Sequence, residues 1–184
     1  GVKLMKPMPE LDALLDRAVG HGVYGTKMRS VIDAANPTGI AANIAQQFEI
    51  GAQISAKGLM PILEPEVTIT IADKAAAEDI VLDEITKHLD ALPDGEEIML
   101  KLSLPTNVNH YKPLVDHPKV LKVVALSGGY NRDDANALLA QQTGMIASFS
   151  RALSEGLSDG QSDADFDATL AATVESIYQA SIAG

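Results

Sequence analysis

The chain has 184 residues, of which 46% are hydrophobic and 21% are charged, and its formal net charge is −11. This length is enough for one domain with a sizeable core, and the acidic charge argues against nucleic acid or an anionic membrane surface as a partner. The absence of cysteine excludes disulfides and thiolate metal sites. No apolar run approaches the roughly 18 residues that a membrane-spanning helix needs, so we expect a cytoplasmic protein.

Short apolar strands alternate with amphipathic helices along the chain. The predicted strands span residues 22–30, 59–67, 97–104, 120–129 and 145–150, and the predicted helices span residues 10–19, 39–58, 72–92, 132–142 and 162–183. Residues 111–118 read as a short helix or an irregular link. Because the strands are apolar on both faces, the pattern favours an α/β fold with a parallel sheet covered by helices. A doubly wound sheet and part of a (β/α)₈ TIM barrel both fit this pattern.

Polar residues or glycines end each of the five predicted strands. In chain order they are Lys27 and Arg29; Glu64 and Glu66; Lys101 and Ser103; Ser127, Gly128 and Gly129; and Ser148 and Ser150, which Arg151 follows. Residues two apart on a strand share a face, and the carboxyl ends of parallel strands form the reactive edge of such folds. Each feature also has an ordinary structural explanation, such as a solvated strand end or a glycine turn. Together they predict that amines, an arginine and carboxylates meet in one cavity.

Lys101 is the most unusual of these residues, because it interrupts the apolar strand "EIMLKLSL". An ammonium group is costly to bury without partners, so Lys101 is either ion-paired for a structural reason or reactive. Apolar surroundings favour the neutral amine of a lysine, which can attack a ketone and form a Schiff base. A carboxyl such as Glu64 could carry the proton transfers, and the glycine turn with Arg151 suits a phosphate. These residues predict an anionic small substrate.

Five segments, "GVYGTKMRS", "PILEPEV", "MLKLSLPT", "VVALSGGY" and "ASFSRAL", occur in an order and spacing that resemble class I fructose-bisphosphate aldolase, in particular its bacterial branch. The resemblance runs nearly end to end. It implies a (β/α)₈ barrel and reversible cleavage of fructose 1,6-bisphosphate to dihydroxyacetone phosphate and glyceraldehyde 3-phosphate, in glycolysis or gluconeogenesis. It also implies that the reaction needs no metal and no cofactor.

The resemblance assigns roles to particular residues of this chain. Lys101 matches the Schiff-base lysine, Glu64 the carboxyl that assists carbinolamine dehydration, and Glu66 its neighbouring acid. Lys27 matches a lysine that handles charge and protons beside the imine. The residues that match phosphate-binding positions are Arg29, Ser127, Gly128, Gly129 and Arg151. Ser150 departs from the animal-type pattern, which has glycine there, and no role is assigned to Tyr178.

The family's barrel has about eight strands, and five are predicted here. We therefore expect residues 1–184 to form one domain, the C-terminal portion of a barrel, without its three N-terminal strands. The expected partners are a sugar phosphate and the N-terminal portion of the barrel, from the same gene or a second chain, with no nucleic acid or membrane; a homo-oligomer stays open. Two alternatives also stay open: another Schiff-base lysine barrel aldolase, and an inactive barrel fragment.

Overall fold

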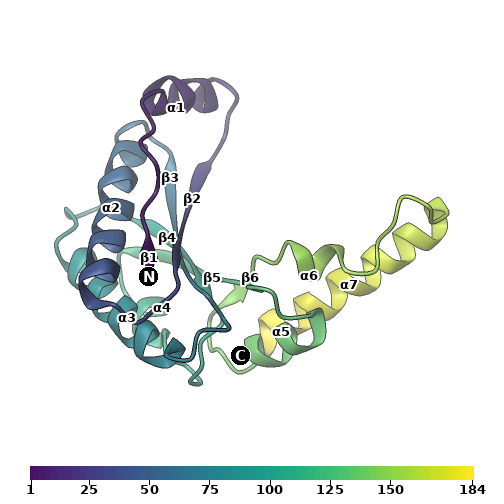
Figure 1. Cartoon of the computed structure of the whole chain (residues 1–184). Helices are drawn as coiled ribbons and strands as arrows, with labels where there is room; N and C mark the ends of the chain where they lie inside the picture. Colours follow the sequence, from purple (N-terminus) through teal and green to yellow (C-terminus); the bar gives the residue numbers. More distant parts are fainter.

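The computed structural model describes all residues, 1–184, and is organised around one six-stranded sheet (Figure 1). The strands are β1 (Val2–Lys3), β2 (Gly25–Ile32), β3 (Met60–Val67), β4 (Ile98–Ser103), β5 (Val120–Leu126) and β6 (Ile146–Ala147). They lie in the sheet in chain order, and every neighbouring pair is parallel except β1 and β2. The predicted parallel α/β sheet is confirmed, and its arrangement is consistent with part of a (β/α)₈ barrel.

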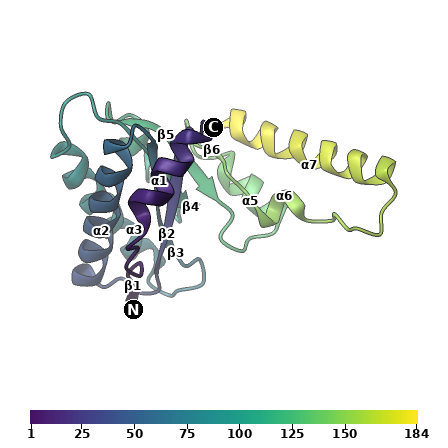
Figure 2. The same ribbon diagram turned by 90° about the horizontal axis from the view of Figure 1, so that it is seen from above.

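Helices alternate with these strands. They are α1 (Leu11–Gly20), α2 (Pro37–Ala56), α3 (Lys74–Asp90), α4 (Lys112–Val115), α5 (Arg132–Leu139), α6 (Arg151–Ser154) and α7 (Asp163–Ala183). Helices α2, α3 and α4 cover one face of the sheet, whereas α5, α6 and α7 lie together near β6 (Figures 1 and 2). The five predicted strands and the five longer predicted helices are all present.

The bounds of two predicted strands were wrong, and one strand was missed. The strand expected over 22–30 begins at Gly25 and runs to Ile32, because α1 ends in a turn where Gly22 has a φ of +69°. The strand expected over 145–150 is only β6, and Ser150 precedes α6 instead. Strand β1 was not predicted: it is two residues long and exists because it pairs with Val31 and Ile32 of β2.

The core lies between the sheet and the helices that cover it. Leu63 of β3 and Leu100 of β4 are at most 1% exposed, as are Ile44 of α2 and Ile85 of α3. Helix α2 approaches the sheet closely at Gly51, where an added Cβ would lie 3.3 Å from a methyl group of Leu63. The core therefore fixes the sheet from its helix-covered face and leaves the opposite face for polar side chains.

The first testable consequence concerns this core. Leu100→Ala is expected to lower the free energy of unfolding by about 2–5 kcal/mol, because it removes buried methyl groups and leaves a cavity. Urea denaturation followed by circular dichroism measures the change. The matched control is Leu121→Ala on the next strand, where the leucine is 46% exposed. A loss as large for Leu121→Ala as for Leu100→Ala would contradict the placement of the core.

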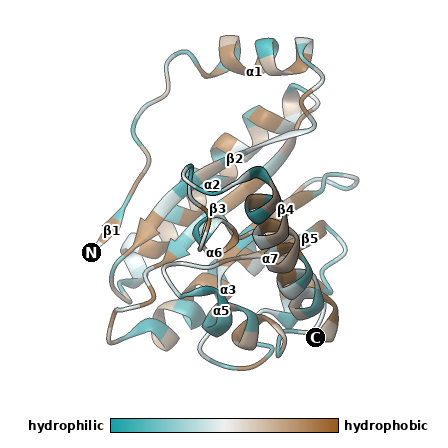
Figure 3. Cartoon of the chain, turned by 90° about the vertical axis from the view of Figure 1, so that its right-hand side faces the viewer, coloured by the Kyte–Doolittle hydropathy of each residue, from teal (hydrophilic) through white to brown (hydrophobic).

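Several large apolar side chains stay exposed on α1 and α7. Helix α1 lies apart from the sheet and is joined to it by extended segments (Figure 3). Only Leu15 of this helix is buried. On α7, Val174, Tyr178 and Ile182 are each at least half exposed. None of the helices combines the length and the apolar character that crossing a membrane would require.

Candidate functional site

The carboxylate of Glu64 on β3 lies between two lysine amines on the neighbouring strands. Its Oε2 forms an ion pair with Nζ of Lys27 on β2, and its Oε1 lies 3.4 Å from Nζ of Lys101 on β4. The side chain of Glu64 is only 5% exposed and that of Lys101 13%, whereas that of Lys27 is 39% exposed. The predicted meeting of amines and a carboxylate is thus present in the structure.

The polar side of β4 results from the alternation of side chains along a strand. Leu100 and Leu102 are fully buried, whereas Lys101 between them keeps a small exposed fraction and faces Glu64. The apolar neighbours of Lys101 in the sequence therefore do not surround its amine, because consecutive residues point to opposite faces of the sheet. Lys101 is instead enclosed by Glu64 and by the residues of the neighbouring strands.

Arg29 and Glu66 form a second pair one step further along the same strands. Nε of Arg29 donates a hydrogen bond of 2.5 Å to Oε2 of Glu66. This hydrogen bond raises the pKa of Arg29 above its usual value, and the nearby negative charges of Glu66 and Glu64 add to the effect. Glu66 is buried, whereas the Arg29 side chain is 52% exposed and so remains accessible to a ligand. The two carboxylates of "EPE" therefore have different cationic partners.

A small cavity of about 100 Å³ joins this cluster to the turn after β5. Its lining residues are Glu64, Glu66, Lys101, Leu126, Ser127, Gly128, Ser148, Ser150 and Arg151. Of the strand-end residues named from the sequence, Lys27, Arg29, Ser103 and Gly129 do not line it. Leu126 is the one lining residue that was not singled out, since an apolar residue at a strand end carries no distinguishing signal.

The turn after β5 has a backbone that only glycine adopts easily. Gly128 has a φ of +62° and Gly129 a φ of +115°. A Cβ on Gly129 would lie 3.9 Å from both terminal nitrogens of Arg151, so the guanidinium sits beside the turn. Arg151 is exposed and has no acidic partner within 4.0 Å. The backbone N–H groups of the glycine turn, which no Cβ shields, and the N–H groups of the Arg151 guanidinium are together suited to binding a phosphate.

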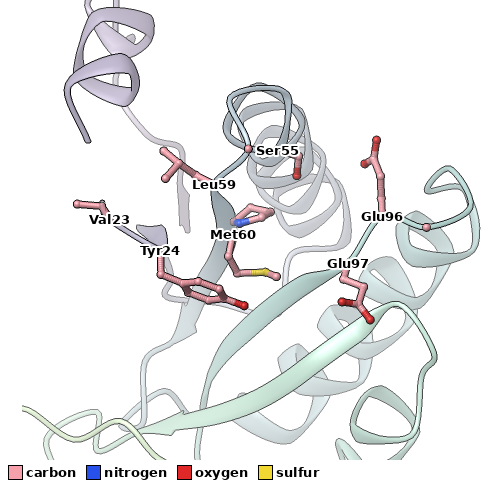
Figure 4. Close-up of a pocket in the computed structure, with 10 residues that line it drawn as sticks. Val23, Tyr24, Ser55, Leu59, Met60, Glu96 and Glu97 are labelled. Atoms are coloured by element: carbon pink, nitrogen blue, oxygen red, sulfur yellow. The ribbon is translucent and has the colours of Figure 1, made fainter. Parts of the chain in front are cut away.

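A larger cavity lies at the opposite, amino ends of the strands (Figure 4). It has a volume of about 450 Å³, and its lining includes Tyr24, Met60, Glu96 and Glu97 but no basic residue. Tyr24 and Met60 lie on one side, with Glu96 and Glu97 across from them (Figure 4). With two carboxylates and no cation, this cavity does not suit an anionic ligand, so the candidate site is the one around Lys101.

Comparison with known proteins finds relatives along nearly the whole chain. A curated protein of Synechocystis, named class 1 fructose-bisphosphate aldolase, is 53% identical over 182 residues, which are 99% of this chain and 61% of that protein. A protein of Porphyromonas gingivalis with the same name is 55% identical, with the same coverage. The chain is similar to class 1 fructose-bisphosphate aldolases along nearly its whole length. It spans about 61% of the length of these relatives, and no family model matches it. The resemblance seen in the sequence is confirmed.

Proposed function

We propose that this chain carries the Schiff-base machinery of a class I fructose-bisphosphate aldolase, with Lys101 as the imine-forming residue. The observation that supports this most directly is the placement of the Lys101 amine 3.4 Å from Oε1 of Glu64, whose other oxygen is paired with Lys27. The names of the two relatives favour fructose 1,6-bisphosphate over the substrates of other Schiff-base aldolases.

In the proposed reaction, the neutral amine of Lys101 attacks C2 of the ketose and forms a carbinolamine. Glu64 accepts the proton that the Lys101 nitrogen gives up and donates it to the departing hydroxyl, so that water leaves, an iminium forms and Glu64 returns to the carboxylate. The C3–C4 bond then breaks: its electrons enter the iminium to give an enamine, and the C4 hydroxyl gives its proton to a base as the aldehyde leaves, which balances the proton that C3 takes up next. Protonation of C3 and hydrolysis of the imine release dihydroxyacetone phosphate. The iminium is the electron sink, so no metal is needed in this scheme.

The anionic groups of the substrate have separate cationic partners in this proposal. Ser127, Gly128, Gly129 and Arg151 bind the phosphate next to the ketone, and Arg29 binds the second phosphate. The positive φ angles of both glycines and the closeness of Arg151 to Gly129 support the first assignment. Lys27 offsets negative charge beside the imine, and Glu66 holds Arg29 in place.

The proposal also includes a partner segment. The relatives are longer than the matched region, and β1 and β6 stand at the two edges of the sheet. Three further parallel strands with their helices, from the same gene or a second chain, would complete an eight-stranded barrel between β6 and β2, in place of the short antiparallel β1. We further propose that the complete enzyme acts in the cytoplasm, as expected for a sugar phosphate substrate, and that it assembles as a homo-oligomer.

The second testable prediction is covalent trapping of the imine. Borohydride reduction of the protein in its native assembly, with dihydroxyacetone phosphate present, is expected to link the three-carbon unit to Lys101. Mass analysis of the peptides locates the adduct, and the matched control replaces the ligand with unphosphorylated dihydroxyacetone, which should label far less. An adduct on Lys27, or none on any lysine, would overturn the proposed role of Lys101.

A further inference from the structure

The backbone contact between β3 and β4 ends just before the reactive residues. Strand β3 pairs with β2 along its whole length, from Gly25 opposite Met60 to Ile32 opposite Val67. With β4 it pairs at only two positions, Ile62 opposite Met99 and Leu63 opposite Leu100. We call the following stretch, residues 64–67 beside residues 101–104, the β3–β4 seam. Pro65 lies in it and has no N–H group to donate.

Side chains close this seam where the backbone does not. Oγ of Ser103, at the end of β4, donates a hydrogen bond of 2.6 Å to the carbonyl oxygen of Val67, at the end of β3. Ser103 is 1% exposed, so this bond is shielded from water. It lies two residues from Lys101 and three from Glu64, and it is therefore a direct link between the strands that carry these two side chains.

A buried ion pair adds a second link at the same place. Lys74, the first residue of α3, pairs with Glu78 one turn later and donates to the carbonyl of Leu104 at 2.8 Å and to Oγ1 of Thr106 at 3.2 Å. Glu78 in turn accepts a hydrogen bond of 2.9 Å from the backbone N–H of Thr106. Helix α3 follows β3 in the chain, so these bonds hold the segment after β4 against the segment after β3.

The pair is poorly explained as a simple stabiliser. Lys74 is 8% exposed and Glu78 1%, and removing two charges from water offsets much of their attraction. What the pair does supply is three directed hydrogen bonds to Leu104 and Thr106, which lie beyond β4. The pair is therefore better explained by a role in fixing the position of the segment after β4 than by a contribution to the free energy of unfolding.

Building on the proposed function, we propose that Ser103 and the Lys74–Glu78 pair are positioning residues that hold Lys101 in contact with Glu64 across the β3–β4 seam. The contact from Glu64 to Lys27 does not depend on them, because β2 and β3 pair continuously past both residues. A displacement of about 1 Å between reacting groups can lower a rate by about a hundredfold, so the loss of these links should affect the chemistry of Lys101.

The first test measures the Lys101–Glu64 contact without any substrate. A small carbodiimide activates a carboxylate, and an amine in contact with it then forms an isopeptide with loss of the activating group. Glu64 can couple to either Lys101 or Lys27, and peptide mass analysis measures the ratio of the two products. The Glu64–Lys27 product is the internal standard, so the ratio measures how closely Lys101 approaches Glu64 across the seam. Ser103→Ala is expected to lower the Lys101 share about tenfold or more.

The matched control is Ser30→Ala on β2. Ser30 is also buried and hydrogen-bonded, at 2.8 Å to both Asn43 and Gln47 of α2, but it lies outside the seam. Its substitution should leave the ratio unchanged. An unchanged ratio in Ser103→Ala, an equal fall in Ser30→Ala, or no Lys101–Glu64 product in the unsubstituted protein would each overturn the inference.

The second test separates positioning from stability. Replacing the pair with apolar residues of similar size, Lys74→Met with Glu78→Leu, removes the bonds to Leu104 and Thr106 without leaving an unpaired charge, so the urea midpoint should stay close to that of the unsubstituted protein. The rate of borohydride trapping should nevertheless fall about tenfold or more, while the affinity for dihydroxyacetone phosphate is retained.

A double variant with full stability and full trapping rate would show that the pair has no positioning role. If the unsubstituted protein does not label Lys101 at all, the proposed aldolase function fails. The isopeptide ratio then still decides the inference about the seam, because it involves no aldolase chemistry.

Discussion

Lys101→Met is expected to abolish imine trapping and to lower the rate of fructose 1,6-bisphosphate cleavage by more than about 10⁴-fold, because the thioether cannot form the covalent intermediate. The fold should persist. Methionine has a similar length, the Lys101 side chain is already largely enclosed at 13% exposure, and Glu64 keeps its pairing with Lys27. We expect the free energy of unfolding to change by less than about 1.5 kcal/mol. Cleavage assays, borohydride incorporation and urea denaturation measure the three quantities.

Lys27→Met is the matched control for this substitution. It removes the other amine that contacts the same carboxylate, on the strand at the opposite side of β3. Because Lys101 remains, the borohydride adduct should still form there, although turnover should slow. Residual cleavage in Lys101→Met comparable to that of Lys27→Met, or an adduct in its place on Lys27, would show that Lys101 is not the nucleophile.

The convergence at the site could be predicted because it needs only two general rules. Alternation along a strand placed Lys27 with Arg29 and Glu64 with Glu66, and a parallel sheet brings strand ends to one edge. The individual pairings could not be predicted, since they depend on the register between strands. Arg29 lies opposite Glu64 in the register but forms its ion pair with Glu66, a detail that no sequence pattern contains.

The Lys74–Glu78 pair shows another limit of the sequence. A lysine and a glutamate four residues apart in "DKAAAED" suggest an ordinary exposed helix pair. In the structure both are buried, because the segment after β4 lies over the first turn of α3. Burial of this kind depends on how a later loop folds back, which local spacing does not encode. The short β1 was missed for a similar reason, since it depends on an available edge of β2.

Glu64→Gln is expected to lower the rate of cleavage by about 10²–10⁴-fold. The amide cannot donate a proton to the departing hydroxyl of the carbinolamine, and it removes the negative charge that lies between the amines of Lys27 and Lys101. Formation of the iminium should become slow, so borohydride incorporation at Lys101 should be delayed rather than absent. Single-turnover trapping over a series of mixing times measures this delay, and equilibrium binding of dihydroxyacetone phosphate should change little.

Glu66→Gln tests whether the effect of Glu64→Gln comes from lost proton transfer or merely from the loss of a negative charge at this edge of the sheet. Glu66 is also buried, but its partner is Arg29 and it has no ion pair with Lys101. Its substitution weakens the hold on a residue that we assign to the second phosphate, so the KM for the bisphosphate should rise more than kcat falls. The trapping rate with the monophosphate should stay near that of the unsubstituted protein. If Glu66→Gln instead delayed trapping as much as Glu64→Gln, the proton donor would be shared between the two carboxyls, and the assignment to Glu64 alone would be wrong.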